Sequence, residues 1–357
     1  MSDSGELAAW IELSLVSGLG NRNFKALLSA FGVPSNILRA SRSDLSRVVS
    51  GSVADRITRR EASAGVDLAL EWASKPAHRV LTLDDPRYPK QLLEIPDPPF
   101  LLYVVGNPSL LSSPALAVVG SRNATPQGLN NAQSFARALS DAGLSICSGL
   151  ALGIDAAAHR GGLEGRSSTL AVLGTGVDIA YPRKNEALWE EIASRGAVVS
   201  EFPLKTPPEA GNFPRRNRLI SGLSRGCLVV EAALGSGSLI TAQLAVEQGR
   251  EVFAIPGSIH SPLSRGCHAL IKQGAKLVES AQDVLEELGE AATLAPSLPA
   301  AYGGHDLLDQ MGFDPCDIDR LTARCGLTAE VVSAILLQLE LEGRVASLPG
   351  GLYQRVS

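Results

Sequence analysis

A basic stretch interrupts the acidic balance of this chain, whose formal net charge is −5. Residues 205–225 hold five lysines and arginines and one acid, and Arg215, Arg216 and Arg218 fall within four consecutive positions. A run of like charge is ordinarily a solvated helix face. These arginines, however, follow an apolar run in a segment marked by Pro and Gly, and guanidinium groups bind phosphate oxygens through paired hydrogen bonds. We therefore interpret the stretch as an anion-binding site.

Phe213 and Asn217 lie among these arginines. An aromatic ring can stack on a nucleobase and an amide can orient its polar edge. Aromatic residues make up only 4% of the chain, so we expect the main contacts to be with backbone phosphates, with weak sequence preference and strong salt dependence. A flexible single strand can enter a crevice that a stiff duplex cannot, so the predicted ligand is single-stranded nucleic acid.

Two glycine- and serine-rich loops precede predicted helices and could bind phosphate through free backbone amides. For either loop alone an ordinary capped turn is the better interpretation, but two such loops on one predicted rim with arginines nearby make anion binding an equal alternative. The candidate residues are Gly120, Ser121 and Arg122 in the first loop and Ser236, Gly237 and Ser238 in the second, with Thr241 one turn later.

Signatures of cofactor binding and catalysis are weak. Gly174-Thr-Gly176 begins like the dinucleotide fingerprint, but Ile179 stands where its third glycine belongs, and there is no Walker A motif. Asp155 and His159, four residues apart, could form an acid–base pair or half of a metal site; a helix-start Asp and an internally satisfied His are the simpler interpretation. We expect no cofactor, no metal and no enzymatic activity.

Composition narrows the class of protein. The chain is 45% apolar, but no apolar run approaches the roughly 20 residues that span a bilayer. Its N-terminus lacks the pattern of a secretory signal, and its five cysteines are an odd number without CxxC spacing. We expect a cytoplasmic protein without membrane contact, disulfide framework or structural zinc.

The hydrophobic pattern predicts an α/β domain over residues 78–288. Short apolar runs alternate with stretches of helical period, as in βαβ units that form a doubly wound, mostly parallel sheet with ligands at the carboxyl ends of its strands. The predicted strands are 115–119, 144–147, 169–173, 197–200, 227–230 and 251–255, and the proline-rich connector before them, IPDPPFLLYVVG, is expected to end in a further strand. Turns rich in Gly, Ser or Thr follow nearly all of them and should share one rim.

The flanking segments predict two smaller domains. Residues 1–77 read as short helices, in which Gly18-Leu19-Gly20 is either a plain turn or a helix-hairpin-helix turn that points amides at phosphate. Residues 289–303 resemble a linker rich in Ala and Pro. Residues 304–357 suggest a winged helix, with an apolar helix at 329–341 and a hairpin turning at 349–351; its eight acids against four arginines favour a protein partner over DNA.

Several segments, in order, carry a family resemblance over residues 101–284. These are VVGSRNATPQG, SGLALGIDAAAHRGGL, AVLGTGVDIAYPRKN, SEFPLKTPPEAGNFPRRNRLISGLS, LVVEAALGSGSLITAQLAVEQGREVFAIPG and GCHALIKQGAKLV. In them the sequence resembles the bacterial DNA-processing family DprA, also called Smf. The resemblance implies an extended Rossmann-like domain that binds single-stranded DNA, protects incoming strands in natural transformation (competence) and loads RecA recombinase onto DNA coated by single-strand-binding protein.

The resemblance also implies site residues and an assembly. The DprA family is not known as a family of enzymes. Its members dimerise through the Rossmann-like domain, which on this chain implies an interface around residues 266–277. His268 stands where the family usually has Asn. Carried onto this chain, the family's DNA pocket comprises Gly120, Ser121, Arg122, Arg183, Lys184, Phe213, Arg216, Asn217, Arg218, Ser236, Gly237, Ser238 and Thr241.

Two rival interpretations remain. One is a nucleotide-processing enzyme like the phosphoribohydrolases of a related Rossmann branch, but GSGSLITA lacks the glutamate of their PGGxGTxxE motif, and the basic stretch exceeds the needs of one monophosphate. The other is a protein-binding scaffold whose arginines meet acidic partners. Release of free base from a nucleotide distinguishes the first rival from DNA binding, and competition by oligo(dT) distinguishes the second.

Overall fold

The computed structural model describes residues 4–289, 305–325, 329–348 and 351–356. Its contacts divide the chain into two compact units, Met1–Thr293 and Leu294–Ser357. The predicted linker, 289–303, lies outside the described residues except for Gly289. No helix among the described residues is long and apolar enough to cross a bilayer.

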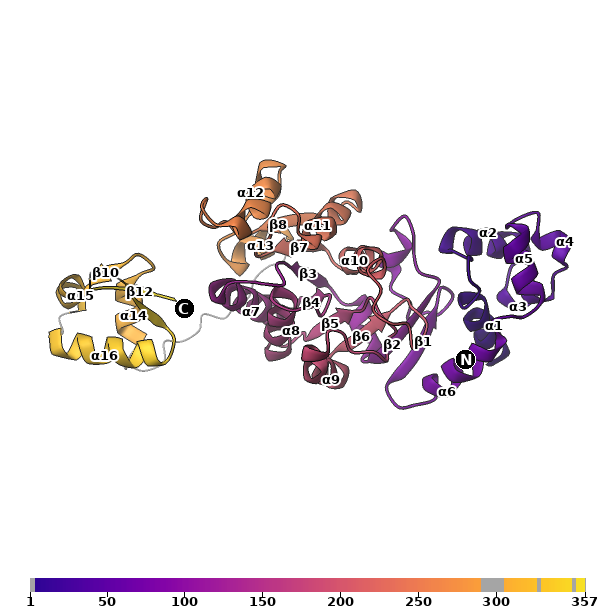
Figure 1. Cartoon of the computed structure of the whole chain (residues 1–357), viewed down its shortest axis with the longest axis horizontal. Helices are drawn as coiled ribbons and strands as arrows, with labels where there is room; N and C mark the ends of the chain where they lie inside the picture. The colour runs from indigo at the N-terminus through magenta and orange to yellow at the C-terminus, as the bar shows by residue number, and fades with distance from the viewer. Residues whose placement is uncertain (1–3, 290–304, 326–328, 349–350, 357) are drawn as a thin grey trace. The chain divides into compact units, whose positions relative to one another are not determined.

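The first unit begins with six short helices (Figure 1). They are α1 (Ser4–Ser14), α2 (Asn21–Phe31), α3 (Pro34–Arg39), α4 (Arg42–Leu45), α5 (Gly51–Thr58) and α6 (Val66–Ala73). Their apolar sides bury Trp10 and Phe24, and the Phe24 ring stacks on Phe100 with centroids 4.0 Å apart. This core continues into the sheet, because Val80 and Tyr103 of its first two strands belong to the same cluster.

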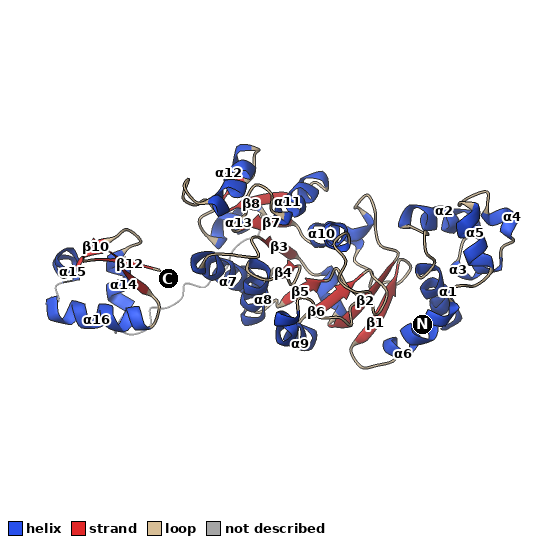
Figure 2. Ribbon diagram, viewed as in Figure 1, coloured by secondary structure: helices blue, strands red, loops and turns tan. Residues whose placement is uncertain are grey.

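A nine-stranded sheet follows, in the order β1-β2-β6-β5-β4-β3-β7-β8-β9 (Figure 2). Its strands are β1 (His78–Thr82), β2 (Leu101–Gly106), β3 (Ala115–Val119), β4 (Ser145–Ser148), β5 (Thr169–Val172), β6 (Ala197–Ser200), β7 (Gly226–Val229), β8 (Glu251–Ala254) and β9 (Lys276–Leu277). Among the described strands of this sheet, only β1–β2 and β2–β6 pair antiparallel. The prediction of a mostly parallel, doubly wound sheet is therefore confirmed, whereas β1 and β9 were not predicted.

Helices cover both faces of this sheet. Because side chains alternate sides along a strand, each buried strand contributes to the hydrophobic cores on both faces. In β3, Leu116 and Val118 pack in one core, while Ala117 and Val119 pack in another. The first core holds residues of α7 (Pro126–Asp141), α8 (Ile154–Glu164) and α13 (Ala281–Glu287). The second holds residues of α10 (Asn212–Gly222), α11 (Gly237–Glu247) and α12 (Arg265–Lys272). α9 (Glu186–Arg195) packs in the core of the N-terminal helices.

Strand order reverses between β3 and β7. The chain runs from β3 outward through β4, β5 and β6 and then returns to place β7 on the other side of β3. The loops after β3 and β7 consequently diverge at the carboxyl edge of the sheet, the position at which doubly wound folds bind ligands.

The described residues of the second unit form three helices and a small antiparallel sheet in the order β10-β12-β11. Its elements are α14 (His305–Met311), β10 (Cys316–Asp317), α15 (Ile318–Cys325), α16 (Ala329–Leu341), β11 (Val345–Leu348) and β12 (Leu352–Arg355). Leu321 and Leu336 are fully buried in its core. Residues 349–350 of the predicted hairpin turn lie outside the described residues.

Candidate nucleic-acid interface

A pocket of about 840 Å³ opens at the point where strand order reverses. It brings together the two predicted glycine- and serine-rich loops and one face of α10. The predicted residues that line it are Gly120, Ser121, Arg122, Phe213, Arg216, Asn217, Ser236, Gly237, Ser238 and Thr241. Arg183, Lys184 and Arg218 do not line it. Asp155 and Ile240 also line it and were not predicted as ligand contacts.

The loop after β3 is tied to the end of β7. Ser121 N donates to the Glu231 carbonyl at 2.7 Å, and a Cβ on Gly120 would come within 2.9 Å of that same oxygen. The Glu231 carboxylate accepts from the backbone N and the hydroxyl of Thr125, the N-cap of α7, at 2.9 and 2.6 Å. This carboxylate therefore already occupies the start of α7. Of the groups predicted in the first loop, the exposed Arg122 side chain is the one that can still contact a phosphate.

The loop after β7 leaves the start of α11 open. The Ser236 hydroxyl caps the helix by accepting from Ser238 N at 3.3 Å. Gly237, the first helical residue, is exposed, and a Cβ on it would meet nothing within 4 Å. Unpaired N–H groups and a positive helix end make this position suitable for a phosphate.

Arg216 lies at the floor of the pocket and is 4% exposed. Its Nη1 donates to the carbonyls of Gly149, at 2.8 Å, and Val172. Burial lowers the pKa of Arg216 to about 10, although Asp155 acts in the opposite direction. At neutral pH the floor therefore carries a positive charge, but part of its hydrogen-bonding capacity is already used by the protein.

Polar side chains hold the turn after β4 beneath this arginine. Asp155 accepts from Gly149 N and Ala151 N at 3.1 and 3.3 Å, and Leu150 N donates to His159 Nε2 at 3.3 Å. Burial raises the pKa of Asp155 despite the opposing charge of Arg216. Burial, together with the charge of Arg216, lowers the pKa of His159 to about 3. Both residues thus have structural partners, which fits the simpler of the two interpretations.

An aromatic pair borders the pocket. The Phe213 ring lies 5.6 Å from that of Tyr181, and the Arg122 guanidinium lies 5.9 Å from the Phe213 centroid. A Cβ on Gly174 would come within 2.7 Å of Phe213 Cδ1, so the glycine of the degenerate fingerprint leaves space for this ring. Tyr181 is 42% exposed and was missed, although it stands two residues before the predicted Arg183.

The predicted basic pair lies beside this aromatic edge rather than in the pocket. Arg183 and Lys184 occupy a short 3-10 turn, Arg183–Asn185, and both are exposed. Arg183 Nε lies 4.0 Å from Glu186, a surface ion pair that is weak in water. Neither side chain is held in a fixed position by a strong contact, so a DNA contact for this pair stays a prediction.

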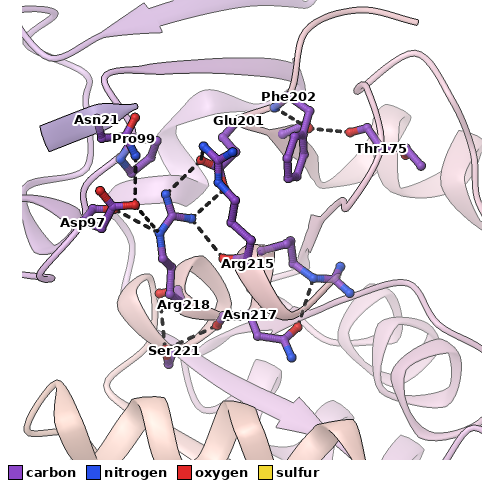
Figure 3. A network of polar contacts seen from close by, with 12 residues as sticks. Asn21, Asp97, Pro99, Thr175, Glu201, Phe202, Arg215, Asn217, Arg218 and Ser221 are labelled. Atoms are coloured by element: carbon purple, nitrogen blue, oxygen red, sulfur yellow. Dashed lines mark hydrogen bonds and ion pairs between the residues drawn. The ribbon is translucent and has the colours of Figure 1, made fainter. Parts of the chain in front are cut away.

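Arg218 has a different environment from the one expected (Figure 3). Its Nη1 and Nη2 donate to the two carboxylate oxygens of Glu201 at 2.6 and 2.8 Å, and its side chain is 11% exposed. Burial alone would lower the pKa of Arg218, but the charge and hydrogen bonds of Glu201 outweigh it and the pKa is raised. The placement of Arg218 therefore opposes the phosphate contact that was expected of it.

Metal chemistry receives no support from the described residues, among which no group of three or more His, Cys, Asp or Glu side chains could hold an ion. The cysteines at 147, 227, 267, 316 and 325 are free. Burial raises the pKa of Cys147 to about 12, so this thiol stays protonated at neutral pH.

Comparisons with known proteins agree over most of the chain. Residues 79–289 match the family model described as DNA recombination-mediator protein A, and residues 290–351 match the DprA winged helix domain. Protein Smf of Escherichia coli is 44% identical over 80% of this chain and 80% of its own length. DNA processing protein DprA of Streptococcus pneumoniae is 48% identical over 62% of this chain and 77% of its own length.

Two solved structures are also similar. DprA from S. pneumoniae superposes with a TM-score of 0.69 and 40% identity, covering 78% of this chain and 97% of that one. DprA from Helicobacter pylori, whose structure concerns its single-stranded DNA binding mode, gives a TM-score of 0.53 and 32% identity over 58% of this chain and 95% of that one.

Proposed function

This chain belongs to the DNA recombination-mediator protein A (DprA/Smf) family, and from that premise we propose that its switch-point pocket binds single-stranded DNA. The observation that carries the proposal is the convergence of Arg122, the open start of α11 and Phe213 around one pocket. These groups come from separate loops, and together they offer what a polynucleotide needs: a cation, free amides and an aromatic face.

Phosphates are held at the rim in this proposal. The exposed Arg122 supplies paired N–H donors, and the amide of Gly237 lies at the positive end of α11. Arg216 adds a long-range charge from the floor, where it attracts the strand without having to make bidentate contacts. Because the rim reads no base edges, affinity depends strongly on salt and weakly on sequence.

A base occupies the aromatic edge. Phe213 and Tyr181 lie 5.6 Å apart with planes tilted by 33°, and Asn217 lines the same pocket. Stacking of this kind tolerates any base, since each has a π-face. Arg183 and Lys184, just beyond Tyr181, extend the positive surface along which the strand leaves the pocket.

Membership of this family supports a recombination role. We propose that the protein protects incoming DNA during natural transformation and loads RecA onto strands coated by single-strand-binding protein. Addition of the protein should then relieve the inhibition that single-strand-binding protein exerts on RecA filament assembly. A RecA ATPase assay on coated circular single strands measures this directly, and an unchanged lag in ATP hydrolysis contradicts it.

We further propose a homodimer through the edge around residues 266–277. Leu277 in the edge strand β9 is 49% exposed, and an exposed strand edge is a natural site for pairing or coverage. His268, which occupies the usual Asn position, makes a 3.0 Å contact between Nε2 and the Gly257 carbonyl. Leu277→Asp should shift the mass measured by light scattering from dimer to monomer.

Binding is tested by titrating fluorescent single-stranded and duplex oligonucleotides at several salt concentrations. The expected result is tighter binding of the single strand, with log affinity falling linearly in log salt. Equal affinity for both forms, or no binding, contradicts the proposal. We also propose that the protein is not an enzyme. Release of free base from nucleoside monophosphates, detected by chromatography, would contradict this proposal.

A further inference from the structure

Helix α10 presents two faces with different partners. Phe213, Arg216 and Ile220 follow helical spacing and line the DNA pocket. Arg215 and Arg218 lie on another side of the helix and do not line it. The three arginines that stand together in the sequence are thus divided, and one of them enters the pocket.

A single carboxylate engages both outer arginines (Figure 3). Glu201, just after β6, accepts from Arg218 Nη1 and Nη2 at 2.6 and 2.8 Å and from Arg215 Nη2 at 3.0 Å. The Glu201 side chain is 2% exposed, while the Arg215 guanidinium also lies 5.3 Å from the Phe202 ring centroid. This geometry fastens α10 to the end of β6.

A second attachment joins the same helix to the segment before β2. Arg218 Nε donates to the Asp97 carbonyl at 3.0 Å and lies 3.3 Å from the Asp97 carboxylate. Asn21, the first residue of α2, donates from Nδ2 to that carboxylate at 3.1 Å. The N-terminal helices thereby reach the helix that carries Phe213.

We propose that Glu201 and Arg218 are positioning residues for the DNA pocket and do not touch the strand. This inference rests on the proposed function. Arginine has five N–H donors, and four of those of Arg218 already donate to Glu201, Asp97 and the Arg215 carbonyl. A phosphate could bind Arg218 through paired hydrogen bonds only by displacing the buried Glu201 carboxylate, which would then keep the contact from the half-exposed Arg215 but lose both hydrogen bonds from Arg218.

Positioning follows from the stiffness of the helix. Phe213 and Arg218 are five residues apart on α10, about 7.5 Å along the axis, so a shift at one is transmitted to the other. Fixing Arg218 sets where the Phe213 ring meets a base and where Arg216 meets the Gly149 carbonyl.

The test uses the full chain and three variants: Arg218→Met, Glu201→Gln and the double variant that carries both changes. Their behaviour is compared with that of Arg122→Met. Affinity for single strands is measured at several salt concentrations, and an oligonucleotide carrying 2-aminopurine reports stacking through its quenching at saturating protein. Arg42→Met, which removes an exposed ion pair with Asp55, is the control. Thermal unfolding confirms that each variant is folded.

Arg218→Met should weaken binding roughly tenfold, as for residues coupled in one network. It should also reduce the quenching and leave the salt slope unchanged, whereas Arg122→Met should lower the slope by about 0.7. The double variant, which buries no unpaired charge, should be folded and bind no more weakly than Arg218→Met.

A slope lowered by Arg218→Met as much as by Arg122→Met overturns the proposal, because it shows a direct phosphate contact. Wild-type affinity and quenching in the folded double variant also overturn it. Absence of binding by the unmodified protein is a different result, since it removes the proposed function itself.

Discussion

The Arg216 guanidinium lies directly against the Cα of Gly149: a Cβ built on this glycine would stand 2.6 Å from Nη2 and 2.7 Å from Nη1. The Gly149 carbonyl accepts from Nη1 at 2.8 Å, while the Gly149 amide donates to Asp155. A single residue, Gly149, thus lies between the buried Arg216 and the buried Asp155. Any side chain at this position must move the arginine or the turn after β4.

Gly149→Ala should therefore both destabilise the protein and weaken DNA binding. Overpacking at a rigid, buried contact costs about 1–3 kcal/mol in the free energy of unfolding, measurable by urea denaturation. Gly51→Ala is a matched control, because its Cβ would meet only Arg42, at an ordinary 3.7 Å. Wild-type stability and affinity in Gly149→Ala would show that the guanidinium is not held as described.

Arg122→Ala should weaken binding to all sequences alike. If Arg122 neutralises one phosphate, the log–log salt slope for single strands falls by about 0.7. Arg166→Ala provides the comparison, since Arg166 is also exposed but precedes β5 and so lies at the opposite edge of the sheet. Identical slopes for the two variants would remove Arg122 from the interface.

Gly174→Ala should separate stacking from stability. The added methyl would meet Phe213 Cδ1 at 2.7 Å, and this half-buried ring can turn away, so the unfolding free energy should change by less than about 1 kcal/mol. Quenching of a 2-aminopurine strand should nevertheless fall toward that of Phe213→Leu. Quenching equal to that of the wild type would place the base elsewhere.

Stability should depend on pH through His159. Its folded pKa, about 3, lies below the ordinary 6.5, so the neutral ring stabilises the fold fully above 6.5, and this contribution is lost as pH falls toward 3. At about pH 5 the loss is roughly 2 kcal/mol. Asp155, with its raised pKa, acts in the opposite direction.

Urea denaturation of the wild type and of His159→Gln from neutral pH to about pH 5 isolates this effect, since Asp155 is present in both. The variant should be less stable at neutral pH but lose less stability on acidification. Parallel pH curves would mean that His159 is accessible to protons in the folded protein.

The strands of the parallel sheet could be predicted because a strand buried on both faces reads as a short apolar run. Both ends of β3 and of β6 agree with the prediction, β5 and β8 end one residue earlier than predicted, and β4 and β7 are shifted by one residue. Strands β1 and β9 lacked that signal: β1 begins with His78 and Arg79, and β9 has two residues. The shared position of the loops after these strands could also be predicted, since neighbouring parallel strands end at the same edge of the sheet.

The individual roles of the arginines could not be predicted, because they depend on partners distant in the sequence. Glu201 precedes Arg218 by 17 positions, and no sequence pattern predicted it as the partner of this arginine. Glu231, which occupies the start of α7, is 106 positions from Thr125. Local charge thus predicted an anion site, whereas the division of α10 into a pocket face and an attached face required the three-dimensional contacts.

The stacking of Phe24 on Phe100 gives the six N-terminal helices a part in the cooperative unfolding of the whole first unit. A chain shortened to start at residue 78 would expose Val80, Phe100 and Tyr103 to water, an apolar surface prone to aggregation. Trimmed versions of this protein should therefore retain those helices, and calorimetry of the first unit should give one transition rather than two.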